Sequence, residues 1–213
     1  MELYTPYCHP SIRSVMQYAT TLLNIPYRWH KNGDKISSTD KFWAENGPIV
    51  TAQYIKEHNN SIVCTGLINL MRRFMGLTIP GIDGTLGQDG IDFPGTTGIW
   101  FYYLHSKGRL QTIDINKNYP SGTLLIRNFR DLETDQGHVA VLYNQGIHSI
   151  MDATIIHAFA QHSYDESSNL DNAGFTGITP FKLSHYYHIQ DTKDDSDGYY
   201  THICLPENWL LID

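Results

Sequence analysis

The chain has 213 residues, a formal net charge of −7 at pH 7, and a composition that is 41% hydrophobic and 12% aromatic. This length suits a single domain, and so many apolar side chains can fill a buried core, which excludes a globally disordered chain. The negative charge argues against a nucleic-acid-binding protein, which would present a basic face, and no apolar run approaches the roughly 18 residues of a membrane span.

The first half of the chain predicts helices. Apolar residues at helical spacing predict a helix over 11–24, which Pro26 must end. A second helix is expected from Cys64 through Met75, with Gly76 closing it as the residue after its C-cap. These two helices would supply the first layer of the fold.

Two stretches in this half have no clean periodicity. Residues 32–60 are interpreted as an insertion that contains one short helix around Ala52 to Glu57. Residues 81–98 contain six glycines and are expected to form a winding loop, while 99–105 fit a short helix or a strand. We interpret both stretches as parts of one domain that spans residues 1–213.

The second half of the chain changes to the pattern of strands. Strands are expected over 123–128, 138–143 and 147–155, each bounded by turn residues, and a last one over 199–205. Helices first and strands afterwards, without alternation of the two, predict an α+β fold. In that fold N-terminal helices pack on a C-terminal antiparallel β-sheet.

The number of cysteines and the N-terminal sequence indicate where in the cell the protein is expected. The three cysteines, Cys8, Cys64 and Cys204, are too few and odd in number for a disulfide framework. The N-terminus carries no basic segment followed by an apolar stretch, as a secretory signal would. We therefore expect a protein that is cytoplasmic, or exported without a recognisable signal peptide.

Cys64 is the candidate nucleophile. It is expected in the first turn of a helix, where unpaired backbone N–H groups and the helix dipole favour the thiolate over the thiol. Its own backbone N–H would point toward an oxyanion that develops on an attacked carbonyl. The alternative is a cysteine that is merely a small buried apolar side chain.

His138 is the candidate general base, because it follows Gly137 at the start of a predicted strand and can reach a neighbouring helix terminus. Folding the chain back about Gln145 would set Asp152 directly opposite His138, with Cβ atoms about 5 Å apart. The Asp152 carboxylate would then fix the imidazole tautomer. A shifted register would change this partner, and His157 is expected to lie beyond the end of the hairpin. A half-exposed strand histidine is the alternative role for His138.

Eleven histidines also raise the hypothesis of a metal site. His185, His188, His202 and Cys204 could supply ligands, but their spacing does not match that of structural zinc sites. We therefore expect no metal ion and no cofactor.

Four segments of the chain resemble, in the same order, four segments of the NlpC-type cell-wall peptidases, which are papain-like enzymes related to the CHAP amidases. No single segment is specific, but their order follows the family pattern over most of residues 12–155. The segments are Leu23 to Trp29, Val63 to Ile68 with Gly76 to Pro80, Pro120 to Ile126, and His138 to Tyr143 followed by Met151 to Ala153.

The resemblance implies a papain-like fold and a cysteine peptidase or amidase. Such an enzyme would cleave an amide bond of a peptide or peptidoglycan-like substrate through Cys64, His138 and Asp152 and an acyl-enzyme intermediate. The resemblance also implies that Tyr27 lies beside the nucleophile and helps to orient the substrate or the oxyanion. A core tyrosine is the alternative role for Tyr27.

Val63 and Thr65 depart from the family pattern. There an acidic residue before the nucleophile and a serine after it hold the free amine of a peptidoglycan stem peptide. An apolar Val63 cannot pair an ammonium, and a buried unpaired charge costs several kcal/mol. We therefore predict that a stem peptide with a free N-terminal alanine is not the substrate. The departures also support the alternative of a catalytically weak or inactive papain-like binding module. A thiol acyltransferase, which passes the acyl group to an acceptor other than water, is a further alternative.

Overall fold

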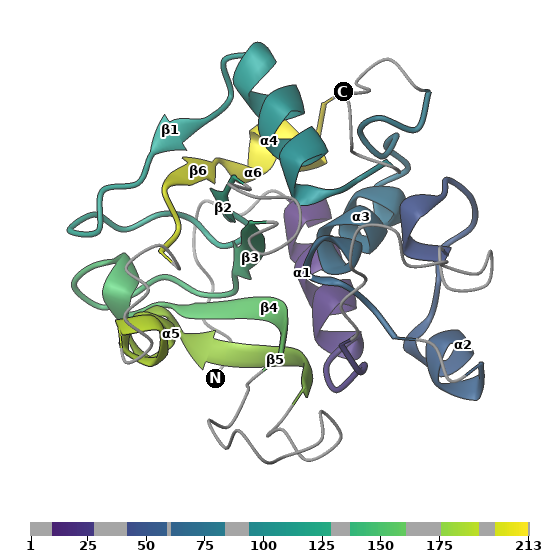
Figure 1. Cartoon of the computed structure of the whole chain (residues 1–213), viewed down its shortest axis with the longest axis horizontal. Helices are drawn as coiled ribbons and strands as arrows, with labels where there is room; N and C mark the ends of the chain where they lie inside the picture. The colour runs from purple at the N-terminus through teal and green to yellow at the C-terminus, as the bar shows by residue number, and fades with distance from the viewer. Residues whose placement is uncertain are drawn as a thin grey trace.

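The computed structural model describes residues 10–27, 42–58, 61–83, 94–128, 137–160, 176–191 and 199–212. Figure 1 shows a twisted sheet with α1 and α3 on one side and α5 on the other. The described helices are α1 (Pro10–Thr21), α2 (Ala52–Glu57), α3 (Cys64–Phe74), α4 (Thr97–Ser106), α5 (Leu183–Asp191) and α6 (Pro206–Leu210), with 3-10 turns at residues 42–44 and at η2 (Ile150–Asp152). The strands are β1 (Gln111–Thr112), β2 (Leu124–Arg127), β3 (His138–Leu142), β4 (Thr154–Ala160), β5 (Thr176–Lys182) and β6 (His202–Cys204).

The strands form one six-stranded sheet in the order β1-β6-β2-β3-β4-β5, and all neighbouring pairs are antiparallel. This arrangement agrees with the predicted α+β class. The short helix within the proposed insertion is confirmed as α2, and α4 confirms the helical alternative for 99–105. Residues 32–41, 59–60 and 84–93 of the two irregular stretches lie outside the described residues. None of the helices in the described ranges is long and apolar enough to cross a membrane.

Two apolar cores lie on opposite faces of the sheet. On one face, α1, α3, α4 and α6 cover side chains such as Val139, Val141 and Ile156. On the other face, α5 covers residues of alternate parity such as Ala140 and Leu142. Successive strand residues point to opposite faces, so the strands are buried on both sides and carry continuous apolar runs.

Helix α3 begins at Cys64 as predicted, and the chain leaves it through Gly76. Gly76 has φ +73°, its N–H donates to Arg73 O at 3.0 Å, and the Leu77 N–H donates to Arg72 O at 3.2 Å. This pair of bonds is a Schellman motif, which requires the left-handed conformation that glycine adopts without strain. The predicted helix end is confirmed.

Buried polar side chains hold α3 in place. Asn69 donates to Gly95 O at 3.1 Å and accepts from the indole of Trp100 at 2.7 Å, which fixes α3 against the start of α4. Arg72 donates to the carbonyls of Thr78 and Trp209 at 2.6 and 2.5 Å. A buried polar group that keeps its hydrogen bonds stabilises one arrangement of the helices over others.

The predicted strand over 147–155 is wrong for most of its length, because β4 begins only at Thr154. In the connection between β3 and β4, Ser149 Oγ accepts the N–H of Met151 at 3.2 Å, which caps η2. This longer connection shifts the hairpin register, so that Val141 pairs with Ile156. His138 therefore does not lie opposite Asp152.

Helix α5 and strand β5 were not expected from the sequence. Leu183, Tyr186 and Tyr187 follow helical spacing and are all buried beneath the sheet. Packing in this core outweighs the β-propensity of the aromatic residues.

Candidate functional site

Cys64 is the first residue of α3, and its side chain is partly exposed. The N-cap residue is Val63, whose side chain has no atom that could cap the helix. The backbone N–H groups of Thr65 and of Cys64 itself hydrogen-bond to the sulfur and oppose the rise in the pKa of the thiol. The uncapped first turn of α3 therefore faces the sulfur.

The start of α4 meets the start of α3 at this point. Thr97 Oγ1 lies 3.9 Å from Cys64 Sγ. The N-cap of α4, Thr96, makes no side-chain capping bond, and its buried Oγ1 has no hydrogen-bond partner among the described residues. Two helix N-termini without side-chain caps thus converge on one cysteine.

Gly137 connects this corner to the sheet. Its φ is +79°, and a Cβ on it would lie 2.8 Å from Thr97 Cγ2 and 2.5 Å from Arg127 O. Only glycine fits so close an approach in this conformation. Gly137 therefore brings the next residue, His138, to the end of the sheet where Thr97 contacts Cys64.

His138 has a histidine as its partner. His138 Nε2 lies 3.1 Å from His157 Nδ1, and both rings are buried. The predicted partner, Asp152, instead accepts the backbone N–H of His148 at 3.2 Å. The sequence reasoning missed His157 because it assumed a short hairpin. The signal that could have found it is the pair His157-Ala158, which follows two isoleucines in the segment that forms β4.

Aromatic rings surround the two histidines. Tyr186 and Tyr200 stack on His138, with centroids 5.7 and 5.8 Å away, and Phe159 stacks on His157 at 5.0 Å. These rings lie on the α5 side of the sheet, whereas Cys64 begins a helix of the opposite layer. The site therefore lies at the end of the sheet, where the two layers meet.

Arg127 is the charged side chain of this corner. It pairs with His138 across β2 and β3 in direct register, and only 9% of its surface is exposed. Directly opposed residues of antiparallel strands project to the same face, with Cβ atoms about 5 Å apart. Arg127 bears on the pKa of both Cys64 and His138, and Cys64 in turn bears on the pKa of Tyr186, whose ring stacks on His138.

Burial keeps the site neutral. It lowers the pKa of His138 to about 3, with a smaller contribution from Arg127, and it lowers the pKa of His157 well below its usual range. Burial also raises the pKa of Cys64, although Thr97 and the backbone N–H groups oppose the rise. The helix start was expected to favour a thiolate. The pKa of Cys64 is raised instead, because loss of hydration outweighs the helix end.

Three predicted site residues remain. Tyr27 lies near Cys64 in space, and Val63 and Thr65 are its neighbours in sequence. Tyr27 forms an isolated parallel bridge with Ile62, and the Cys64 thiolate adds to the effect of burial in raising the pKa of Tyr27. Val63 is partly buried, and Thr65 is buried in the first turn of α3. No carboxylate stands at either position to receive an ammonium.

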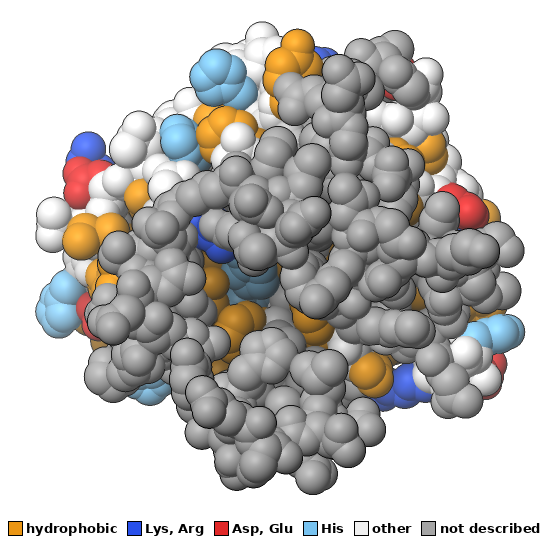
Figure 2. Space-filling model, viewed as in Figure 1, with side chains coloured by type: hydrophobic (Ala, Val, Ile, Leu, Met, Phe, Trp, Pro, Cys, Tyr) orange, Lys and Arg blue, Asp and Glu red, His pale blue; other side chains and the backbone are white. Residues whose placement is uncertain are grey.

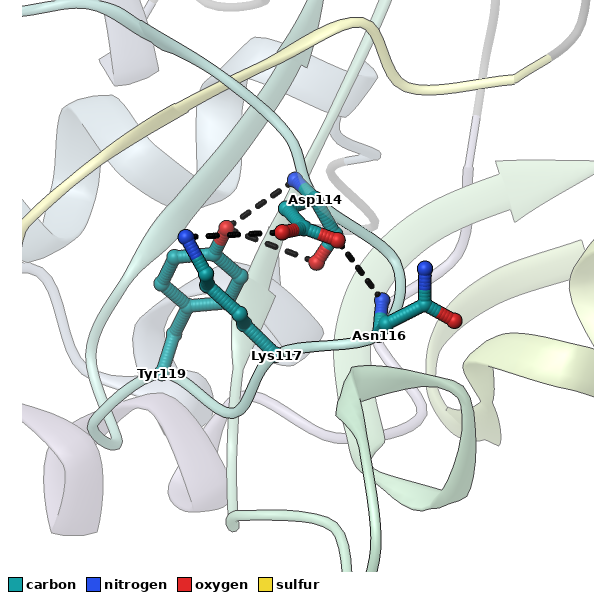
Figure 3. Close-up of polar contacts among 4 residues, drawn as sticks. All are labelled: Asp114, Asn116, Lys117 and Tyr119. Carbon is teal, nitrogen blue, oxygen red and sulfur yellow. Dashed lines mark hydrogen bonds and ion pairs between the residues drawn. The ribbon is translucent and has the colours of Figure 1, made fainter.

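A second polar cluster lies in the turn after β1 and is self-contained (Figure 3). Asp114 accepts the N–H of Asn116 at 3.0 Å and pairs with Lys117 at 3.4 Å, while its own N–H donates to the Tyr119 hydroxyl at 3.0 Å. The pKa of the Asp114 carboxyl is lowered, mainly by the hydrogen bond from the Asn116 backbone N–H. Lys117 acts in the same direction, and loss of hydration opposes both. These contacts are those of an Asx turn and serve to hold a surface loop.

No group of three or more metal-binding side chains occurs within the part of the chain that the structure describes. Near the position of β3 and β4 in Figure 1, Figure 2 shows hydrophobic side chains close to a histidine and to a Lys or Arg side chain. Buried titratable side chains whose pKa values are shifted, as those of His138 and Cys64 are, mark a candidate functional site.

Comparisons with known proteins do not assign the chain to a family. No protein-family model matches the chain, and no curated protein and no solved structure is detectably similar to it.

Proposed function

We propose that this protein is a papain-like cysteine hydrolase of the NlpC type, a peptidase or amidase, in which Cys64 is the nucleophile and His138 the general base. The third member of the proposed catalytic triad is His157, in place of Asp152. The observation that carries the proposal is the contact of 3.1 Å between His138 Nε2 and His157 Nδ1, at the end of the sheet where Cys64 begins α3.

This contact determines which nitrogen of His138 can act as the base. Nε2 is occupied by His157, which leaves Nδ1 for the thiol. Nδ1 is basic only when the His138 proton resides on Nε2 and is donated to His157 Nδ1. The proton of His157 then resides on its own Nε2. A histidine thus holds the tautomer that a carboxylate or amide holds in other triads.

The reaction follows from these roles. As Cys64 Sγ attacks the carbonyl carbon, the S–C bond forms and the thiol proton passes to His138 Nδ1. The oxyanion develops near the backbone N–H groups at the start of α3. His138 then gives the proton to the leaving amine as the C–N bond breaks. Water, deprotonated by His138, finally cleaves the thioester and restores the thiol.

The low pKa of His138 and the raised pKa of Cys64 favour a neutral pair over a thiolate–imidazolium pair in the resting site. Proton transfer would then accompany attack, as in serine hydrolases. The same two shifts favour the alternative of a papain-like binding module with weak or no catalysis. A thiol acyltransferase would form the same acyl-enzyme and pass the acyl group to an acceptor other than water.

The pH dependence of Cys64 alkylation by iodoacetamide tests the proposal. With His138 as general base, the rate stays level from mildly acidic to neutral pH. An unassisted thiol instead reacts about tenfold faster for each pH unit below its pKa. His138→Gln should convert the level profile into the rising one. Cys64→Ala reports the background from the other two cysteines. A rising profile in the unaltered protein would contradict the proposal and favour the binding module.

A further inference from the structure

Thr97 contacts the proposed nucleophile but has no step in the proposed reaction. It is the first residue of α4, only 4% of its surface is exposed, and its Oγ1 lies 3.9 Å from Cys64 Sγ. This contact is longer than an ordinary hydrogen bond, so it holds the hydroxyl only loosely in the resting site. A donor of this kind can turn toward a charge that develops during the reaction.

The methyl group of the same side chain sets where the hydroxyl lies. A Cβ on Gly137 would lie 2.8 Å from Thr97 Cγ2, so this methyl packs against the glycine that precedes His138. Cγ2 and Oγ1 share one Cβ, and a β-branched side chain has few rotamers, so the packed methyl also directs the hydroxyl. Thr97 therefore connects the strand of the proposed base with the proposed nucleophile.

The oxyanion of the proposed reaction would form close to this hydroxyl. When Cys64 Sγ attacks a carbonyl carbon, the oxygen that takes the negative charge is two bonds from the sulfur. A donor 3.9 Å from the sulfur can reach an oxygen at that position. The backbone N–H groups at the start of α3 are donors on a separate segment, and donors from two segments commonly hold an oxyanion together.

We propose that Thr97 is an oxyanion donor, whose hydroxyl donates a hydrogen bond to the substrate carbonyl oxygen as that oxygen becomes negative. This inference rests on the proposed function and adds a catalytic residue to it. The hydroxyl transfers no proton, because His138 still takes the proton of the thiol. The hydrogen bond is strongest in the transition state, so it raises the rate of acylation rather than the affinity for substrate.

Two other roles for Thr97 make different predictions. A threonine that only packs needs its methyl and not its hydroxyl, so valine would replace it. A threonine that only holds the sulfur would matter equally for every reaction of Cys64. An oxyanion donor matters only when Cys64 attacks a carbonyl group.

Two reactions of the full-length protein separate these roles. Attack of Cys64 on p-nitrophenyl acetate forms an S–C bond to a carbonyl carbon, breaks a C–O bond through an oxyanion, and releases p-nitrophenolate. Attack on iodoacetamide forms an S–C bond to a tetrahedral carbon, releases iodide, and forms no oxyanion. Thr97→Val keeps the shape of the side chain and removes the hydroxyl. It should slow the first release of p-nitrophenolate about a hundredfold and change the alkylation rate by less than about threefold.

A second pair of variants tests the hydroxyl without the methyl. Thr97→Ser should acylate about tenfold more slowly than the parent, because its hydroxyl is less firmly directed, and Thr97→Ala should be at least as slow as Thr97→Val. This pair decides the question even if Thr97→Val fails to fold. Thr123→Val is the control, because it removes another buried hydroxyl, which donates to Pro120 O at 2.7 Å. It should leave the ratio of the two rates unchanged.

The inference and the proposed hydrolase fail in different ways. If Thr97→Val acylates as fast as the parent, or slows alkylation as much as acylation, the oxyanion role is wrong and the hydrolase stands. His138→Gln should slow both reactions, because both use the base. If Cys64→Ala releases p-nitrophenolate as fast as the parent, the proposed hydrolase is wrong and the oxyanion role fails with it.

Discussion

The two ends of α3 are built in opposite ways. At the C-terminal end, Arg72 donates to two carbonyls and to the Tyr103 hydroxyl at 3.0 Å, and a Schellman motif closes the helix. At the N-terminal end, Val63 offers no cap and the neighbouring Thr96 Oγ1 has no partner among the described residues. One end holds the helix in place, and at the other the backbone N–H groups of Cys64 and Thr65 are directed at the thiol.

The two buried arginines differ in the same way. Arg72 is enclosed by carbonyls and by the rings of Trp100 and Tyr103, whose centroids lie 5.6 and 5.4 Å from its guanidinium carbon. Arg127 instead faces the titratable groups of the site. Arg72 therefore fixes helix packing, whereas the charge of Arg127 bears on the pKa of the proposed nucleophile and of the proposed base.

The largest effect should come from Cys64→Ala at the reactive end. We expect it to lower turnover of an ester probe such as p-nitrophenyl acetate by at least about a thousandfold, because the nucleophile is lost. The unfolding free energy should change by no more than about 1 kcal/mol, because Cys64 is only partly buried. Steady-state kinetics and urea titration measure the two quantities. Unchanged turnover would place the chemistry elsewhere.

The second prediction separates the two candidates for the third catalytic residue. His157→Ala should slow alkylation of Cys64 by about a hundredfold, because His138 loses the contact that fixes its tautomer. Asp152→Ala is the matched control and should alter the rate by less than about threefold. The thiol reaction rate near neutral pH measures both. If Asp152→Ala has the larger effect, the roles of the two residues are reversed.

The third prediction concerns the structural end. Arg72→Met should lower the unfolding free energy by about 3 kcal/mol, since it leaves the carbonyls of Thr78 and Trp209 without their buried donor. The rate of Cys64 alkylation should change far less than in His157→Ala. Chemical denaturation followed by tryptophan fluorescence gives the stability. A variant as stable as the parent would mean that those carbonyls find other donors.

Local signals were readable in the sequence and long-range pairing was not. Helix α3 could be predicted because Cys64 and Gly76 bound an amphipathic stretch, and β3 because His138 opens an apolar run after a glycine. The partner of His138 could not, because η2 lengthens the connection and moves the register. Arg127 was missed for the same reason, since its place beside His138 depends on how β2 pairs with β3.

The last and smallest effect is the pH dependence of stability. Burial, with a contribution from Arg127, lowers the pKa of His138 in the folded protein from 6.5 to about 3. Between these values the unfolded chain binds a proton that the folded protein does not. His138 therefore makes unfolding easier as the pH falls through this window, and has no such effect above pH 6.5.

Removing the imidazole should weaken that dependence. Denaturant titrations of the parent protein at about pH 7 and about pH 5 should show a loss of stability, and His138→Gln should show a smaller loss. His157→Gln should act in the same direction, because burial lowers its pKa as well. His148→Gln, on the exposed connection after β3, is the control and should follow the parent. A parent whose stability does not change over this range would mean that His138 keeps an ordinary pKa. The neutral resting pair would then be wrong, and proton transfer from Cys64 to His138 could precede attack.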